Sequence, residues 1–573
     1  MKIRNWIISI LASALLIAAV YFIAVQPLPE VPVYDGELRF DATQSMHYLA
    51  ELVTRFPQRD YTHSDRQEAA YWLEEQFRAT GLEVFTQDFD EVIAGEEVTG
   101  LRNVYAVLPG QRPEAILVVG HYDIPPFVTQ GAADDGSGVA ATLELARIFA
   151  SEGTPRWTMI FMASDSEEYG AMCGSFNFLE KSGWKDKLAA VIALDLLNMG
   201  EMKAMKVRGM SIQQGYVPLW LREMSLQAVA LETSAVDTPT WMEWVERSVA
   251  IAPTEHGVFL RSGIPAVNLT GAPVDQAWHS GNYHTTGDTI DKIWPESMDR
   301  YGRATERILR AMQSMEHFPE PDMFYLKTGV DQYIPGLPLR IMQLLALLPL
   351  VFGVFASWKA AVNFTKENVW NEIRRFITFL GAGALGYLTL WLASENGLMI
   401  KYELYPATQK DPALNNPQLL PLILTVAAIV IGYLILNRLL RPGKGDAGVG
   451  RTVGLSGMLI LIVTAIFFDA GFAALAFLAP AILFWPLVGG GRSLTRRVIN
   501  GILAVSIAFI FGAFIFLFSK LYYIGHVWWY ILMCASYGLF RARAVFTFLA
   551  AAALAILFFK AAIGYVNTRI VSK

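Results

Sequence analysis

The chain has 573 residues, of which 54% are hydrophobic and 17% are charged, and its net charge is −6. The charges are unevenly divided, because residues 1–339 hold 26 basic and 45 acidic side chains, whereas residues 340–573 hold 20 basic and 7 acidic ones. An acidic front part lacks the clustered Lys and Arg that bind nucleic acid, so nucleic acid is excluded as a partner. Two cysteines, Cys173 and Cys534, are too few for a disulfide framework.

Residues 6–25 form an uninterrupted apolar stretch behind two positive charges, Lys2 and Arg4. About 20 apolar residues in a helix cross the hydrocarbon core of a bilayer, which is roughly 30 Å thick. A cleaved signal peptide would have a shorter apolar core and a small-residue cleavage site, whereas this stretch ends at Gln26-Pro27. We therefore predict an uncleaved transmembrane anchor over residues 1–31, with membrane lipid as a partner.

The next part of the chain, residues 32–335, alternates between strand and helix patterns. The clearest strand patterns lie at residues 115–119, 157–163 and 189–194, and the clearest helix pattern lies at residues 138–150. Ser64 and Gln67 have the spacing of a capping box, and the helix behind them is expected to end at Gly81. The alternation predicts an α/β domain with a mostly parallel or mixed sheet and helices on both faces.

After Pro335 the chain changes to long apolar stretches, which predict an all-α polytopic membrane domain over residues 336–573. About eight transmembrane helices are expected, at residues 341–358, 376–393, 419–436, 453–468, 470–488, 499–519, 524–540 and 545–566. With the large domain left out, alternate loops hold 15 Lys and Arg on one side and 5 on the other. By the positive-inside rule, the amino terminus is expected in the cytoplasm. The large domain is then expected in the periplasm or, in a eukaryote, in the lumen of the endoplasmic reticulum.

The predicted membrane helices carry few charges, chiefly Asp469 and Lys560. Transport pathways are marked by ionisable residues inside the membrane. We therefore expect an anchor, or a bundle that could bind a membrane protein or a second copy of the chain, rather than a transporter.

Acidic and imidazole side chains follow the predicted strands, where a ligand site is expected in an α/β sheet. His121 comes directly after a strand, and Asp123, two residues later, can accept the other imidazole N–H. Asp134 and Asp135 lie in a Gly-rich turn before a helix, where an acidic N-cap would explain only one of them.

Three further groups extend this set. Glu167 and Glu168 follow a strand, and adjacent buried carboxylates repel unless they share a cation or one is protonated. Asp195 ends a buried strand, where a charged residue needs a partner. In a polar loop between apolar segments, residues 283–289, His284 is favoured as a ligand over His279. Imidazole and carboxylate ligands with open positions suit catalytic zinc. Five ligands that share one carboxylate supply three contacts to each of two ions.

The motifs, in chain order, are His121-x-Asp123, Gly131-Ala132-x-Asp134-Asp135-x-Ser137-Gly138, Glu167-Glu168, Leu194-Asp195, Tyr283-His284-Thr285 and Asp288-Thr289. This ordered set resembles the co-catalytic di-zinc aminopeptidase family, which also contains glutamate carboxypeptidase. The plan of one anchor, a peptidase domain and a carboxyl-terminal multi-helix membrane domain resembles that of the endoplasmic reticulum metallopeptidases.

The resemblance implies a set of metal ligands. Asp134 would bridge two zinc ions. His121 and Asp195 would complete the first ion, and Glu168 and His284 would complete the second.

The resemblance also implies catalytic roles. Glu167 would be the general base, Asp123 would orient His121, and Tyr283 would support the oxyanion. Glu255-His256 resembles a Ser-Asp-His segment of the family with Glu in place of Asp.

The function implied is that of a membrane-bound zinc exopeptidase, aminopeptidase-like, that hydrolyses peptides through a two-zinc-activated hydroxide. Two alternatives remain: acyl transfer like that of a glutaminyl cyclase, and a non-catalytic receptor or scaffold with a peptidase-like domain. The sequence leaves open whether the substrate is an aminopeptidase, carboxypeptidase or dipeptidase substrate. Residues 199–254, with Trp220, Trp241 and Trp244, line either the specificity pocket or ordinary core.

Overall fold

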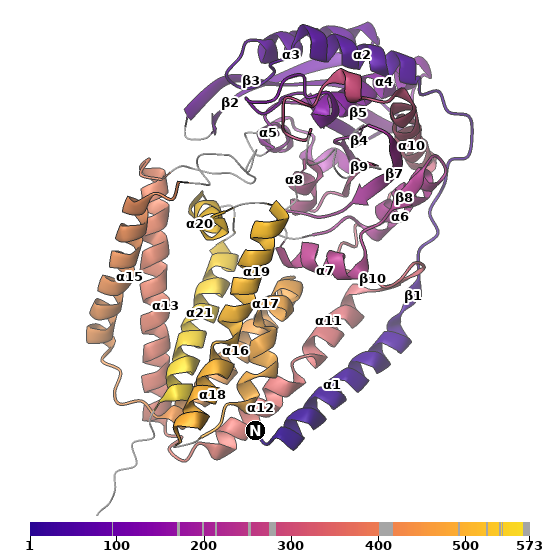
Figure 1. Cartoon of the computed structure of the whole chain (residues 1–573). Helices are drawn as coiled ribbons and strands as arrows, with labels where there is room; N and C mark the ends of the chain where they lie inside the picture. Colours follow the sequence, from indigo (N-terminus) through magenta and orange to yellow (C-terminus); the bar gives the residue numbers. More distant parts are fainter. Residues whose placement is uncertain are drawn as a thin grey trace, which may run out of the picture. The chain divides into compact units, whose positions relative to one another are not determined.

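A computed structural model describes the chain except for residues 94–95, 169–171, 198–199, 213–214, 250–253, 274–281, 400–415, 491–492, 523–524, 538–539, 541 and 565–573. The described residues form two compact units (Figure 1). One unit holds Met1–Gln26 and the described residues from Ile334 onward, and the other holds Pro27–Tyr333.

The unit Pro27–Tyr333 is built on a mixed eight-stranded sheet with the order β2-β3-β5-β4-β6-β9-β7-β8. The strands are β2 (Glu83–Ile93), β3 (Glu96–Leu108), β4 (Arg112–His121), β5 (Trp157–Ser164), β6 (Leu188–Leu194), β7 (Met202–Arg208), β8 (Ser234–Val236) and β9 (Ala266–Pro273). The central strands β5, β4, β6 and β9 are parallel to one another. The pairs β2–β3, β3–β5 and β7–β9 are antiparallel, and the edge strand β8 is parallel to β7. The expected strands lie within β4, β5 and β6.

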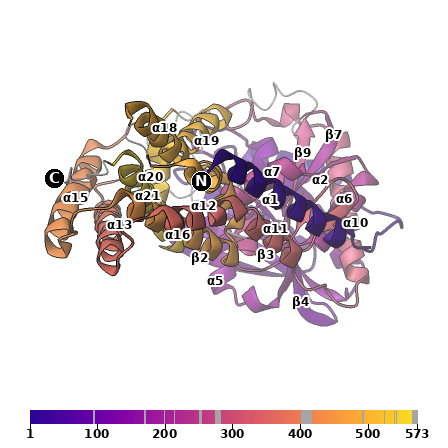
Figure 2. The ribbon, with the colours of Figure 1, turned by 90° about the horizontal axis from the view of Figure 1, so that it is seen from below.

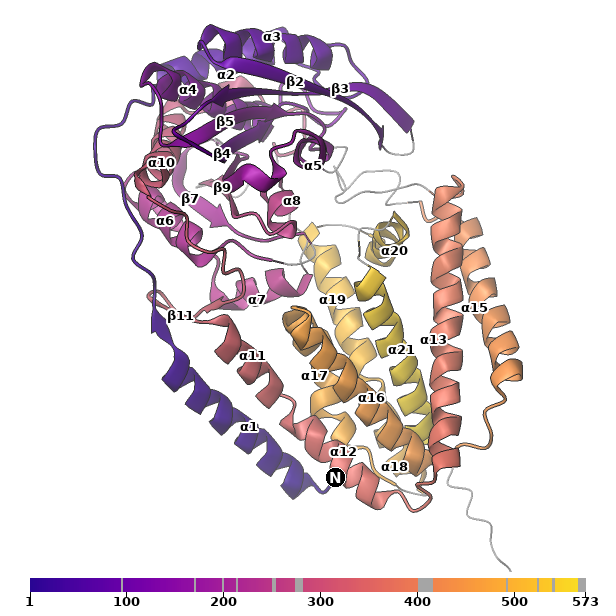
Figure 3. The ribbon, with the colours of Figure 1, turned by 180° about the vertical axis from the view of Figure 1, so that it is seen from behind.

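Helices cover both faces of this sheet (Figure 3). The α-helices in the described part of this unit are α2 (Ala42–Arg55), α3 (Asp65–Ala79), α4 (Ser137–Ser151), α5 (Cys173–Lys181), α6 (Leu219–Ala230), α7 (Thr240–Val249), α8 (His256–Arg261) and α10 (Pro295–Ser314), of which α7 contacts β10 rather than the large sheet. Helices α2, α3 and α4 lie on one face, and α5 and α8 lie on the other. Because both faces are covered, all eight residues of β5 are buried, which explains its continuous apolar sequence.

The start of α3 differs from the expectation. Ser64 is the N-cap residue, but its side chain makes no capping hydrogen bond, so the predicted capping box does not form. The carboxylate of the next residue, Asp65, instead accepts a hydrogen bond from the Gln58 N–H at 3.0 Å. The helix stops where expected, because Gly81 adopts a φ of +84°, which glycine tolerates and a helix does not.

A second, three-stranded sheet has the order β1-β11-β10, with β1 (Gln26–Pro27), β11 (Gln332–Ile334) and β10 (Leu326–Lys327). These strands lie where the chain passes from one unit to the other.

The other unit is helical. Its helices are α1 (Ile3–Ala24), α11 (Gly336–Leu345), α12 (Leu348–Ala360), α13 (Lys366–Glu395), α15 (Leu419–Leu440), α16 (Ala447–Phe467), α17 (Gly471–Leu483), α18 (Leu494–Ala504), α19 (Ser506–Tyr522), α20 (Val527–Tyr537) and α21 (Ala542–Ile563). Helix α13 packs against α15 and α21, as the view from below shows (Figure 2).

Six helices of the described residues are long and apolar enough to cross a membrane: Ile3–Ala24, Gly336–Ala360, Lys366–Glu395, Leu419–Leu440, Ala447–Phe467 and Ala542–Ile563. The pair Leu494–Ala504 and Ser506–Lys520 meets the same test together but is bent by 44°. Two of the expected spans, residues 470–488 and 524–540, are shorter apolar helices, Gly471–Leu487 and Val527–Ser536. Each expected apolar stretch is thus helical over most of its described residues, but not every one is a single straight span.

Candidate metal centre

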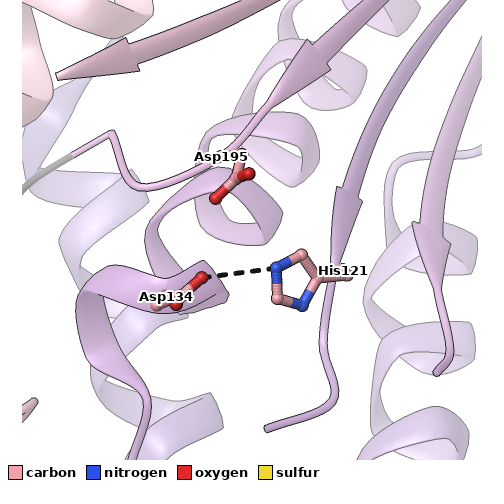
Figure 4. A group of neighbouring side chains, drawn as sticks. All are labelled: His121, Asp134 and Asp195. Carbon is pink, nitrogen blue, oxygen red and sulfur yellow. Dashed lines mark ion pairs between the residues drawn. The ribbon is translucent and has the colours of Figure 1, made fainter. Parts of the chain in front are cut away.

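The sheet brings His121 and Asp195 together at one edge. His121 is the last residue of β4, and Asp195 directly follows β6. The two strands are parallel neighbours with Val119 opposite Ala193, so their carboxyl ends lie side by side. The turn before α4 supplies Asp134, which points at both residues (Figure 4). Ligand atoms of His121, Asp134 and Asp195 all lie within 4.8 Å of one another.

Asp134 also belongs to a second group. Its carboxylate lies between two imidazoles, with Oδ1 3.4 Å from His121 Nε2 and Oδ2 3.0 Å from His284 Nε2. Glu168 Oε1 is 2.9 Å from the same His284 nitrogen. Ligand atoms of Asp134, Glu168 and His284 therefore also lie within 4.8 Å of one another. The five ligands expected from the sequence form two triads that share Asp134.

Glu167 lies beside these triads without belonging to either. Its Oε2 is 3.8 Å from His121 Nε2, and together with His121 and Glu168 it forms a third close grouping of ligand atoms. The geometry alone therefore leaves both glutamates in reach of a metal ion.

The carboxylate of Asp123 holds the backbone of the glutamate pair. Its Oδ1 accepts the N–H of Glu167 at 2.9 Å, and its Oδ2 accepts the N–H of Glu168 at 3.1 Å. His121 Nδ1 lies 3.2 Å from the backbone carbonyl oxygen of Asp123 and 3.5 Å from its carboxylate. Because a carbonyl oxygen only accepts, it fixes the proton on Nδ1 and leaves Nε2 free to face Asp134.

Asp135 braces the turn that carries Asp134. Its carboxylate accepts backbone N–H groups of Gly138 at 3.0 Å, Leu196 at 3.1 Å and His121 at 3.3 Å. It thereby ties the turn to β4, to the start of α4 and to the segment after β6. The sequence offered no reason for the second aspartate of the pair, and this bracing supplies it.

Asp288 supports the same turn from the loop that carries His284. Its Oδ1 accepts the Ala133 N–H at 2.7 Å, and its Oδ2 accepts the Asp134 N–H at 3.0 Å. Burial raises the pKa of Asp288 to about 7, although these hydrogen bonds favour the carboxylate. Sequence reasoning gave Asp288 no role, and the only signal was its place in the family motif.

The site has an excess of buried negative charge. Burial, followed by repulsion from Asp134, raises the pKa of Glu168 to about 8 and that of Asp195 to about 7. Burial and its acidic neighbours likewise raise the pKa of Glu167 well above its usual range. Asp195 Oδ1 is buried and accepts no hydrogen bond within the described part of the chain. A buried carboxylate oxygen without a donor is costly unless a cation is present.

The same negative charge shifts the pKa values of the two histidines. Burial alone would lower the pKa of His121 and His284, yet both pKa values are raised well above the usual value. Glu167 acts on His121 and Glu168 acts on His284, with Asp134 contributing to both. Imidazole nitrogens and carboxylate oxygens are ligands that zinc accepts, and a zinc cation would balance the excess negative charge of the carboxylates. The residues present therefore suit the metal that the sequence suggests.

Tyr283 and Glu255 flank the cluster. The Tyr283 ring stacks on His284, with ring centroids 3.9 Å apart, and burial keeps its pKa well above 10, so the hydroxyl stays protonated. Glu255 accepts hydrogen bonds from the hydroxyls of Ser164 and Ser175, and burial raises its pKa. Two serine donors thus satisfy the glutamate that replaces the family's aspartate. His256 is buried, which lowers its pKa to about 3 and keeps it neutral.

Two expectations about neighbouring residues have different outcomes. His279 lies outside the described residues. Of the tryptophans considered for a specificity pocket, Trp220 is buried in the main core, whereas Trp241 is 66% exposed on α7. These two residues therefore share no pocket lining.

The mixed sheet and the two triads at its edge are those of a zinc-peptidase-like domain, and comparison with known proteins agrees. Residues 103–309 match peptidase family M28, so this part of the chain is similar to that family. The match ends before the helical unit that follows Ile334.

Curated relatives are similar to part of the chain. Leucine aminopeptidase 1 of Sclerotinia sclerotiorum is 23% identical over 298 residues, which cover 48% of this chain and 74% of that protein. Vacuolar membrane protease of Clavispora lusitaniae is 29% identical over 31% of this chain and 15% of its own length. BOS complex subunit NCLN of Gallus gallus is 27% identical over 28% of this chain and 31% of its own. Among solved structures, BSAP, a zinc aminopeptidase from Bacillus subtilis, covers 50% of this chain and 99% of its own with 15% identity and a TM-score of 0.42.

Proposed function

We propose that the protein is a membrane-bound zinc exopeptidase of the aminopeptidase type. The observation that carries the proposal is the pair of triads that share the buried Asp134, because one carboxylate between two three-ligand groups suits two ions rather than one. The match to peptidase family M28 supports both the peptidase activity and zinc as the metal.

The residues of this chain then have distinct tasks. Zinc ions held by the two triads would polarise the peptide carbonyl and lower the pKa of the attacking water. Glu167 accepts the proton of that water and returns it to the leaving amine. The protonated hydroxyl of Tyr283 donates a hydrogen bond to the developing oxyanion. Asp123 keeps the backbone of the glutamate pair in place.

The six long apolar helices and the similarity to a vacuolar membrane protease support a membrane location. We propose three parts, an anchor over residues 1–31, a peptidase domain over residues 32–335 and a membrane domain over residues 336–573. By the positive-inside bias, the peptidase domain faces away from the cytoplasm, and peptides on that side are its substrates. Protease added from the cytoplasmic side should leave the peptidase domain intact, and its cleavage there would contradict this orientation.

The decisive experiment separates the two neighbouring glutamates. Glu167→Gln cannot accept the proton and should reduce turnover of an unblocked peptide by about 10²–10⁴ while two zinc ions stay bound. Glu168→Gln should lose zinc first, because a neutral amide is a poor ligand for a dication. The assignment fails if Glu167→Gln keeps near-normal turnover, or if it loses metal while Glu168→Gln retains it. An amino-blocked version of the same peptide should resist the wild-type enzyme.

One observation favours a second candidate, a non-catalytic subunit of a membrane complex. The chain is similar to a protein that is named as a complex subunit rather than as an enzyme. In that case zinc-loaded wild-type protein would hydrolyse neither unblocked nor blocked peptides. Any turnover that disappears in Glu167→Gln decides for the enzyme.

A further inference from the structure

Helix α7 turns its charged residues inward and its apolar residues outward. Glu243 is fully buried and Arg247 is nearly so, whereas Trp241 is 66% exposed and Val245 is 45% exposed. Trp241 and Val245 are four residues apart, so they share one face of the helix. A helix whose outer face meets water has the opposite arrangement. The pattern is that of a helix whose outer face meets an apolar phase.

Buried ion pairs fix this orientation. The Glu243 carboxylate accepts from Arg222 at 2.8 Å and from Arg247 at 2.8 Å. Near the end of the helix, the hydroxyl of Tyr216 donates to Glu246 at 2.7 Å. A rotation that buried Trp241 would leave these charges unpaired, and breaking a buried ion pair is strongly destabilising. The ion pairs therefore keep the face of α7 with Trp241 and Val245 on the outside of the unit.

Helix α7 is attached to the small sheet at the junction of the two units, next to β10 in Figure 1. Thr240 donates its hydroxyl to the carbonyl of Lys327, in β10, at 2.8 Å, and Arg247 donates to the carbonyl of Met323 at 3.1 Å. Strand β10 pairs with β11, and β11 pairs with β1.

Both outer connections of that sheet lead directly into apolar helices. Strand β1 begins two residues after Ala24, the end of α1, and β11 ends two residues before Gly336, the start of α11. Two residues span at most about 7 Å. Both helices belong to stretches long enough to cross a membrane. The sheet, and α7 with it, is thereby held by the chain itself within a short reach of the bilayer surface.

We propose that the face of α7 with Trp241 and Val245 lies in the lipid interface and seats the peptidase unit on the membrane surface. This inference rests on the proposed membrane location. Tryptophan is enriched at the level of the headgroups, and helices with one apolar face lie in the plane of the interface. Val330, 81% exposed in the turn between β10 and β11, offers a second apolar contact in the same small sheet. A lipid surface is favoured over a protein partner because the two tethers keep the sheet that holds α7 near lipid without any further component.

The test is nitroxide labelling of the full chain in vesicles of phosphatidylcholine and phosphatidylglycerol, with the two native cysteines replaced. Labels at Trp241→Cys and Val245→Cys should collide with oxygen several-fold more than with a water-soluble nickel chelate. Leu231→Cys, 52% exposed at the end of α6, is the matched apolar control and should favour the nickel chelate. Leu11→Cys, 57% exposed in α1, reports on membrane insertion itself.

The possible outcomes separate the two proposals. If Leu11→Cys is in lipid while both α7 labels collide freely with nickel, α7 faces water and the inference is wrong, although the membrane location stands. If the α7 labels are shielded from oxygen and nickel alike, a protein surface covers this face, either the helical unit or a second copy, and the inference is also wrong. If Leu11→Cys itself favours nickel, the membrane location fails.

Discussion

Asp123→Asn tests how the centre is assembled, because the carboxylate accepts two backbone N–H groups that the amide cannot both accept. In the variant, one N–H of the glutamate pair would face the amide oxygen and the other would face the NH₂ group. The hydrogen bond from His121 Nδ1 is made to the backbone carbonyl and survives the substitution. The perturbation should therefore reach the glutamates and leave the imidazole in place.

The magnitude follows from one lost hydrogen bond to a charged acceptor. Such a bond contributes about 1.5–3 kcal/mol, and each 1.36 kcal/mol is a factor of ten in rate. If the whole loss falls on the position of Glu167 and Glu168, turnover should drop by about 10- to 160-fold. Zinc affinity should weaken by about 10- to 100-fold, as is typical when a group that orients ligands is removed.

Zinc content and turnover of the purified full chain measure both effects. Asp41→Asn is the control for the change of Asp to Asn, because Asp41 accepts the N–H groups of Thr43 at 2.8 Å and Gln44 at 3.3 Å through Oδ1 alone, which an amide oxygen can replace, at the exposed start of α2. The control should keep both zinc and turnover. Asp123→Asn should cost less turnover in a Glu167→Gln background than in the wild type, because contacting residues are not additive. Losses that simply multiply, or a variant with normal zinc and turnover, would refute the reasoning.

Two further predictions concern the turn and the charge. Gly138→Ala would push a Cβ into the carboxylate of Asp135, so zinc binding should fall although no ligand is changed. Gly512→Ala is the control, because its Cβ would meet no atom within 4 Å, and it should have no effect. Zinc titration of both variants decides this. In chelator-treated protein, the folded-state pKa values of about 8 for Glu168 and about 7 for Asp195 exceed the unfolded values near 4, so the folded state binds more protons. Its melting temperature should therefore be highest in acid and fall between roughly pH 4 and 8, and a melting temperature that rises over that range would contradict the charge argument.

The sequence was sufficient to find the edge of the sheet where the site lies. Buried strands read as continuous apolar runs, and the first polar residue after each run marks its carboxyl end, as with His121 and Asp195. The pairing of β4 with β6 then brings the two residues together. The ends of these strands can be read from the sequence because each one depends only on where a local run of apolar residues stops.

The bracing of the site could not be predicted in the same way. Asp288 is more than 150 positions from the N–H groups that it accepts, and Asp135 joins three separate segments. Such contacts depend on how one loop lies over another, which no local pattern records. Ser64 shows the same limit at short range, because the capping-box spacing was present but Asp65 hydrogen-bonds to Gln58 instead.

Hydropathy located the apolar helices described in the helical unit, but it did not locate the breaks within them. The expected span at residues 470–488 is divided into α17 and a 3-10 turn, and Pro480 lies inside α17. Proline removes a backbone donor and ends or kinks a helix. The expected span at residues 499–519 is bent between α18 and α19. A window average over apolar residues is insensitive to both features.

The charge of the site also bears on the choice between an enzyme and a scaffold. The carboxylates of Asp134, Glu167, Glu168 and Asp195 lie close together, and burial, followed by their mutual repulsion, raises the pKa of the last three. In a domain that never bound metal, this arrangement would only destabilise the fold, because neutral side chains of the same size would pack without repulsion. Cations that compensate the charge remove this repulsion, and the relief adds to the free energy of metal binding. The physical chemistry of the site thus favours a domain that holds metal, and a scaffold would have to hold it as well.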